Sequence, residues 1–95
     1  MNVSNSVITN NSGNGIYAGN VKDRVVLTNV NITNNEGFGG FLVRDGAADI
    51  WINASNIKSN WGDGINVSFA GGAVMINGTS VTDNCWRGLL VSLHH

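Results

Sequence analysis

The chain has 95 residues, one cysteine and a formal net charge of −1, and only 12% of its residues are charged. This length allows a single domain, and the lone Cys85 excludes an internal disulfide. The basic residues are scattered, so we expect no nucleic-acid binding. The apolar runs are far shorter than a membrane span, so none is expected in this segment.

One pattern occurs four times: a β-branched apolar residue, an asparagine three positions later, and then a glycine before an apolar residue. The repeated asparagines are Asn11, Asn35, Asn60 and Asn84, at spacings of 24, 25 and 24 residues. A fixed period of this length indicates a stack of repeats in which each unit covers the next.

Each period divides into three short predicted strands with alternating inward and outward residues. In the first strand the inward pairs are Val25 and Leu27, Ile50 and Ile52, and Val74 and Ile76. The outward residues between them are Val26, Trp51 and Met75. The second strand has one inward residue in each period, at Ile8, Ile32, Ile57 and Val81, and ends at the repeated asparagine.

The third strand follows the glycine. Its inward pairs are Ile16 and Ala18, Phe41 and Val43, Ile65 and Val67, and Leu89 and Val91. Its outward residues are Tyr17, Leu42, Asn66 and Leu90. Connections of constant length, residues 19–24, 44–49 and 68–73, lead to the next period, and we expect them to protrude and to carry function.

The recurring Asn-x-Ile-x-x-Asn-x-Gly-x-Gly-Ile string resembles the repeat of the pectin-lyase-like superfamily over essentially the whole chain. The resemblance implies an all-β fold, a right-handed parallel β-helix of about four coils of 24–25 residues with three short strands per coil. The asparagine-rich form is most similar to β-helix segments of animal extracellular proteins such as bark beetle (Anakonda). It is also similar to bacterial sugar-processing and copper-delivery β-helix proteins.

The resemblance implies an extracellular or cell-surface location and a structural or interaction role, for example in cell junctions or adhesion. The chain begins within a repeat, so we expect residues 1–95 to be one segment of a longer solenoid. Six Asn-x-Ser/Thr sequons are possible glycosylation sites: Asn2, Asn10, Asn31, Asn53, Asn66 and Asn77.

The repeated asparagines are expected to form a structural ladder at a corner of the coil, in left-handed backbone, with stacked side-chain amides. Four glycines are expected to permit a backbone bend that a Cβ would obstruct: Gly15, Gly40, Gly64 and Gly88.

No two carboxylates fall at matching positions of neighbouring coils, so we expect no catalytic residues, no metal site and no cofactor in this segment. The alternative function is that this segment forms part of a carbohydrate-active enzyme, either a polysaccharide lyase or a glycoside hydrolase. Asp63 and Arg87 fall one coil apart and predict an exposed ion pair beside Trp61 and Trp86, with Arg87 able to stack on an indole. His94 and His95 are terminal, as likely a truncation remnant as a site.

The outward residues predict two apolar stripes, one along Val26, Trp51 and Met75 and another along Tyr17, Leu42 and Leu90. An exposed apolar stripe marks an interaction surface or a ligand groove. Three occupants remain open: the rest of the parent chain, a protein partner, or a carbohydrate held against the aromatic rings near Asp63 and Arg87.

Overall fold

The computed structural model describes residues 1–46, 49–70 and 72–93, which form ten β-strands and no helix. The strands are β1 (Asn2–Thr9), β2 (Ile16–Gly19), β3 (Val25–Thr33), β4 (Gly39–Gly46), β5 (Ile50–Asn53), β6 (Asn56–Lys58), β7 (Asp63–Ala70), β8 (Val74–Asn77), β9 (Ser80–Thr82) and β10 (Leu89–Leu93). Within this described part, no helix has the length and hydropathy of a membrane span.

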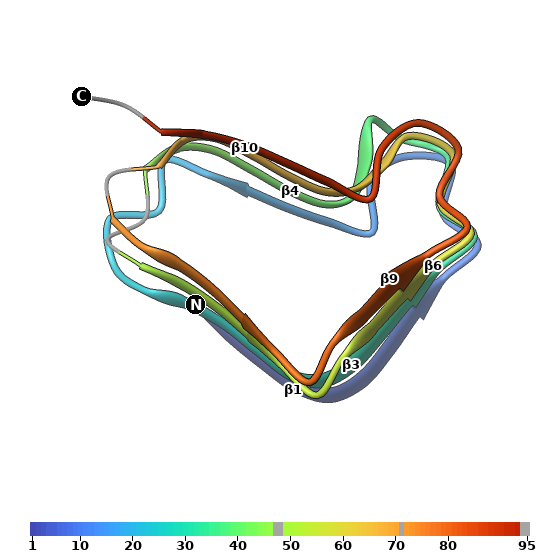
Figure 1. The fold of residues 1–95 in the computed structure, drawn as a ribbon, viewed down its shortest axis with the longest axis horizontal. Helices are drawn as coiled ribbons and strands as arrows, with labels where there is room; N and C mark the ends of the chain where they lie inside the picture. Colours follow the sequence, from blue (N-terminus) through green and yellow to red (C-terminus); the bar gives the residue numbers. More distant parts are fainter. Residues whose placement is uncertain (47–48, 71, 94–95) are drawn as a thin grey trace.

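Every strand pairs in parallel with the strand one period away along the chain. Leu27, for example, lies opposite Val3 on one side and Ile52 on the other. A six-stranded sheet has the order β8-β5-β3-β6-β9 with β1 also on β3, and a four-stranded sheet has the order β10-β7-β4-β2. The chain therefore winds as a parallel β-helix whose coils superimpose in Figure 1.

One residue with left-handed backbone makes the corner between the first and second strand segments of each coil. The corner residues are Asn5, Asn29, Ala54 and Gly78, with φ between 49° and 56°. In the first two coils the strand continues through the corner, so β1 and β3 each combine two of the predicted strands. In the later coils the corner separates β5 from β6 and β8 from β9. All three predicted segments are thus present in each coil.

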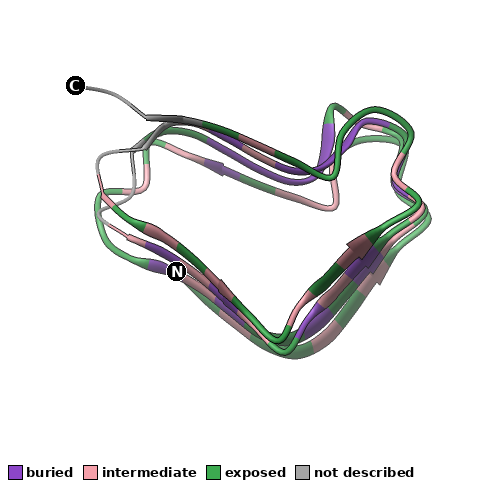
Figure 2. Ribbon diagram, viewed as in Figure 1, coloured by how far each residue is buried: buried purple, intermediate pink, exposed green. Residues whose placement is uncertain are grey.

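The inward positions predicted from alternation form the core, and they are fully buried in the second and third coils. Of the equivalent residues in the outer coils, Val74 and Val81 are partly buried and pack against this core. Leu89 and Val91 were predicted to point inward but are 48% and 36% exposed, because β10 lies at the end of its sheet. Figure 2 maps this burial along the coils. The prediction missed one inward column, in which Val30 donates its N–H to Ser55 Oγ at 3.1 Å. Serine at this position concealed the column, because an inward position is recognisable in sequence by an apolar side chain.

The connections between coils stack in register, as their constant length predicts. Asn20 N donates to Arg44 O at 3.0 Å, and Ile50 N donates to Ala73 O at 2.8 Å. Parts of the predicted loops are strand, because β2, β4 and β7 extend into them. Residues 47–48 and 71 of these loops, and His94 and His95, lie outside the described residues.

Candidate functional site

The four repeated asparagines stack into a hydrogen-bonded ladder, as predicted. Asn11 Nδ2 donates to Asn35 Oδ1 at 2.8 Å, Asn35 Nδ2 to Asn60 Oδ1 at 3.0 Å, and Asn60 Nδ2 to Asn84 Oδ1 at 3.0 Å. Each of these oxygens also accepts the backbone N–H of the asparagine one coil earlier, at 3.0–3.2 Å. The ladder therefore ties each coil to the next through side chain and backbone together.

The ladder is saturated where it is buried. Asn35 and Asn60 are each only 1% exposed, and the second amide hydrogen of each donates to a strand carbonyl, at 3.3 Å and 3.1 Å. No buried side-chain nitrogen or oxygen of the described residues lacks a partner. A buried amide with all its donors and acceptors paired stabilises the fold, whereas an unpaired one would cost free energy.

Left-handed backbone occurs at this corner, but the prediction placed it one residue too late. It belongs to the residues before the ladder: Asn10, Asn34, Ser59 and Asp83, with φ between 54° and 60°. These side chains are exposed or half-buried, because the turn that they make directs the next side chain, the ladder asparagine, into the coil.

The predicted obstruction of a Cβ at the repeated glycines is confirmed at Gly15, Gly40 and Gly64. None of Gly15, Gly40, Gly64 and Gly88 has a positive φ. A Cβ added to Gly40 would lie 2.6 Å from Asn60 Nδ2, and one added to Gly64 would lie 2.6 Å from Asn84 Nδ2. These two glycines therefore make room for the ladder amide of the next coil without left-handed backbone.

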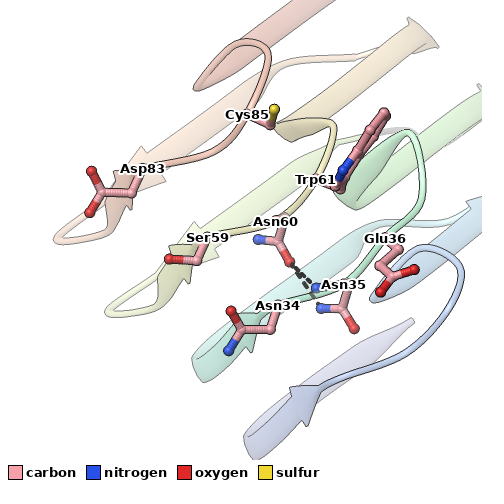
Figure 3. A pocket seen from close by; sticks show the side chains of 8 residues that line it. All are labelled: Asn34, Asn35, Glu36, Ser59, Asn60, Trp61, Asp83 and Cys85. Carbon is pink, nitrogen blue, oxygen red and sulfur yellow. Dashed lines mark hydrogen bonds between the residues drawn. The ribbon is translucent and has the colours of Figure 1, made fainter.

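An open groove of about 330 Å³ runs along the ladder across three coils (Figure 3). One side carries the left-handed residues Asn34, Ser59 and Asp83, and the other carries Glu36, Trp61 and Cys85, with Asn35 and Asn60 between the two rows. The groove combines amides, a hydroxyl, two carboxylates and an indole, so it can form hydrogen bonds and apolar contacts with one ligand.

The two carboxylates of the groove stand far apart. Glu36 belongs to the second coil and Asp83 to the fourth, on opposite sides. Two coils separate them by roughly 10 Å along the axis before the width of the groove is added. Paired glycosidase carboxyl groups lie about 5 to 9.5 Å apart. The groove therefore does not present such a pair.

The ion pair between Asp63 and Arg87 exists, but its predicted exposure was wrong for the acid. Asp63 is fully buried, whereas the Arg87 side chain is 58% exposed. Asp63 Oδ1 accepts Arg87 N and Nε, both at 3.0 Å, and Oδ2 accepts Arg87 Nη2 at 3.3 Å and Asn66 Nδ2 at 3.1 Å. Asn14 Oδ1 likewise accepts Gly39 N at 3.0 Å in an earlier coil. Asp63 thus joins two coils and is not free to act on a substrate.

Three exposed aromatic side chains gather beside the groove, one from each of three successive coils. The ring centroids of Trp61 and Trp86 are 5.7 Å apart, and those of Phe38 and Trp86 are 6.1 Å apart. Both indoles were predicted here, but Phe38 was not, because it lies in the one-residue insertion of the second repeat. We call these three residues the aromatic cluster. The predicted stacking of Arg87 on an indole is not found among the described residues. The cation–π contact there is made by Arg24, whose Cζ lies 4.0 Å from the ring centroid of Trp51.

A comparison with family models matches residues 1–94 to the right-handed β-helix region. The stacked parallel coils of the structure agree with this match. The chain belongs to this family. Comparisons with curated protein sequences and with solved structures gave no match.

The first predicted stripe of this β-helix region is in register but only partly open. Trp51 lies between Val26 and Met75 on neighbouring strands, as predicted. Met75 is 48% exposed, whereas Val26 and Trp51 are half-buried, and the guanidinium of Arg24 lies on the Trp51 ring. This stripe is therefore a weaker candidate surface than predicted.

The second predicted stripe is interrupted. Tyr17 pairs with Leu42, and Leu42 with Asn66. Tyr17 is 57% exposed, but Leu42 is 1% exposed, so its prediction as a surface residue was wrong. Leu42 is buried without belonging to the core cluster. Leu90 is half-buried, and the Asn66 amide is bonded to Asp63.

The remaining predicted sites of the β-helix region are dispersed. Of the sequon asparagines, Asn2, Asn10, Asn31 and Asn77 are exposed, and Asn53 and Asn66 are half-buried. Cys85 is a free, exposed thiol on the groove. Within residues 1–46, 49–70 and 72–93, no group of three or more His, Cys, Asp or Glu side chains could hold a metal ion.

Proposed function

We propose that this β-helix region is a non-catalytic scaffold of an extracellular or cell-surface protein and that it binds its partner through the groove and the aromatic cluster. The observation that carries the proposal is the clustering of Phe38, Trp61 and Trp86, which are 61%, 56% and 50% exposed. Large aromatic side chains left open together on a soluble surface are typical of recognition sites.

The carboxylates argue for binding rather than turnover. Both carboxylate oxygens of Asp63 accept hydrogen bonds from Arg87 of the next coil, and Oδ2 also accepts one from Asn66. Glu36 and Asp83 lie too far apart to act as a paired acid and base. The turn that carries the cluster is fixed by backbone bonds, such as Trp61 N to Asn35 O at 2.7 Å. A fixed turn with exposed side chains serves recognition at a small entropic cost.

The partner is a protein, including the rest of the parent chain. A carbohydrate is the second candidate, and the groove favours it, since indole faces contact sugar rings while amides and carboxylates accept and donate hydrogen bonds to hydroxyls. In that reading the segment is a carbohydrate-binding module or one part of a lyase or hydrolase cleft.

The proposal is tested with two matched variants. The purified chain, a Trp61→Ala/Trp86→Ala variant and a Trp51→Ala control are each immobilised and exposed to an extracellular fraction of the source organism and to a polysaccharide panel. We expect retention by the native chain and the control, and loss of retention with the double variant. The same proteins are assayed on polyuronates with calcium for unsaturated products and reducing ends.

Two results would contradict the proposal. Turnover of a polysaccharide that disappears in Asp63→Asn would identify an enzyme. Retention that survives in the double variant and is lost in Trp51→Ala would place the contact on the stripe of Val26, Trp51 and Met75.

A further inference from the structure

We propose that the aromatic cluster and Glu36 form a cage for a trimethylammonium group on a ligand without phosphate. The inference rests on the proposed function and names the ligand chemistry of that site. The cage is a hollow of about 210 Å³ lined by Glu36, Gly37, Phe38, Trp61 and Trp86.

The rings are inclined to one another and not stacked flat. The Trp61 and Trp86 planes make an angle of 60°, and those of Phe38 and Trp86 make 49°. Inclined rings surround a space with π-faces, and such faces attract a cation through their quadrupole. Recognition of quaternary ammonium groups by several rings is an established use of this arrangement.

The column of Trp86 has no side chain in the earlier coils. Trp86 N donates to Gly62 O at 3.1 Å, and Gly37 N donates to Gly13 O at 3.0 Å, so Trp86 stands in a column that holds glycine in the earlier coils. The indole therefore has bare backbone one coil away. The one-residue insertion of the second repeat adds Phe38 as the further ring.

The site is electrostatically suited to a cation that the protein does not supply. Glu36 lines the hollow, and no basic side chain of the described residues does. Arg87, the neighbour of Trp86 in sequence, has its guanidinium bonded to Asp63 through Nε and Nη2. The guanidinium of Arg24 lies on Trp51 instead.

The lining favours a quaternary ammonium over a primary amine or a guanidinium. Lysine and arginine side chains carry three and five N–H donors that need acceptors when they leave water. Glu36 is the one lining side chain that can accept. A trimethylammonium group has no N–H and presents methyl groups to the rings. A phosphate beside it is disfavoured, since Glu36 and Asp83 both line the adjoining groove.

The test uses the full chain and small probes. Choline, its neutral isostere 3,3-dimethylbutan-1-ol, phosphocholine and the trimethyl-lysine amino acid are titrated by NMR and by tryptophan fluorescence. At a partly exposed site we expect choline to bind roughly three- to tenfold more tightly than the neutral isostere, because the two share shape but differ in charge. Comparison of choline with trimethyl-lysine distinguishes the two sources of a trimethylammonium group, a choline ligand and a trimethylated lysine side chain.

Variants assign the binding to the cage. Trp61→Ala and Trp86→Ala should each weaken choline binding several-fold, and Glu36→Gln should weaken it while leaving the neutral isostere unchanged. Trp51→Ala serves as the matched control, since that indole lies on another face. Circular dichroism melts show whether each variant is folded. If Trp61→Ala or Trp86→Ala does not fold, Glu36→Gln and Phe38→Leu test the cage in their place.

Four outcomes would overturn the inference. Equal binding of choline and the neutral isostere would show that charge plays no part. Equal loss in Trp51→Ala would place the site elsewhere. Phosphocholine binding as tightly as choline would refute the phosphate-free assignment. If no probe binds but partner retention still depends on Trp61 and Trp86, the cage is wrong and the proposed function stands.

Discussion

Replacement of Asn60 by alanine should destabilise the fold far more than the small change in side-chain size suggests. Asn60→Ala removes four hydrogen bonds at once. Its Oδ1 accepts Asn35 N at 3.1 Å and Asn35 Nδ2 at 3.0 Å, and its Nδ2 donates to Ile32 O at 3.1 Å and to Asn84 Oδ1 at 3.0 Å. The position is 1% exposed, so water does not replace these bonds without rearrangement.

The magnitude follows from the groups left behind on Asn35. Its backbone N–H and one amide hydrogen lose their acceptor inside the coil. At about 1 to 3 kcal/mol for each stranded buried group, the loss is about 2 to 6 kcal/mol. A domain of this size has a total stability of about 5 to 15 kcal/mol, so the variant should be close to unfolding.

The matched control is Asn11→Ala. Asn11 is exposed, and its amide donates one bond, to Asn35 Oδ1. Loss of one such bond costs about 0.5 to 1.5 kcal/mol. Urea unfolding followed by circular dichroism gives both free energies of unfolding. Equal and small losses in the two variants would refute the argument that buried saturation of the ladder stabilises the stack.

Three further predictions test the packing described above. Gly40→Ala should destabilise the fold by about 1 to 3 kcal/mol in the same urea assay, since its Cβ would overlap Asn60 Nδ2, whereas Gly13→Ala, with nothing within 4 Å, should be neutral; similar values for both would contradict the close-packing role. Asp63→Leu should cost about 1 to 3 kcal/mol and Asp63→Asn clearly less, because leucine leaves the Arg87 N–H without an acceptor whereas asparagine retains an oxygen for it; equal melting temperatures would show that the buried oxygens contribute nothing. Ile57→Asp should abolish the cooperative melt because it places an unpaired charge in the fully buried column, and an unchanged melt would refute the register of β6.

The coil was predictable from sequence because every coil repeats the residues that build it, namely the inward apolar residues and the ladder asparagine. In the second and third coils the inward positions of the first and third strand segments are buried where alternation puts them, and the ladder falls at the predicted spacing. Val30 and Ser55 escaped the pattern because a hydroxyl and an isopropyl group fill one column in different coils. A search restricted to apolar residues cannot find such a column.

The surface was less predictable because strand alternation reports direction and not exposure. Leu42 points away from the core and is buried, and Trp51 is half-buried with Arg24 on its ring. Asp63 was expected in solvent because it is an acid in a turn, yet its oxygens take the place of an asparagine amide oxygen between coils. These outcomes depend on neighbours one coil away, which the local sequence pattern does not specify.

The same construction explains how the residues proposed for recognition can collect at this turn. Each turn is held by its backbone, through Trp61 N to Asn35 O at 2.7 Å and Cys85 N to Asn60 O at 2.9 Å, whatever the side chain at the bonded position. The ladder beneath fixes the coil, and the side chains above it are free to differ. Serine, glutamate, tryptophan and cysteine can therefore follow the ladder asparagine in successive coils without a change of fold. A β-helix that separates its buried ladder from its exposed turn positions in this way can change the exposed side chains while the bonds of the ladder and of the turn backbone stay in place.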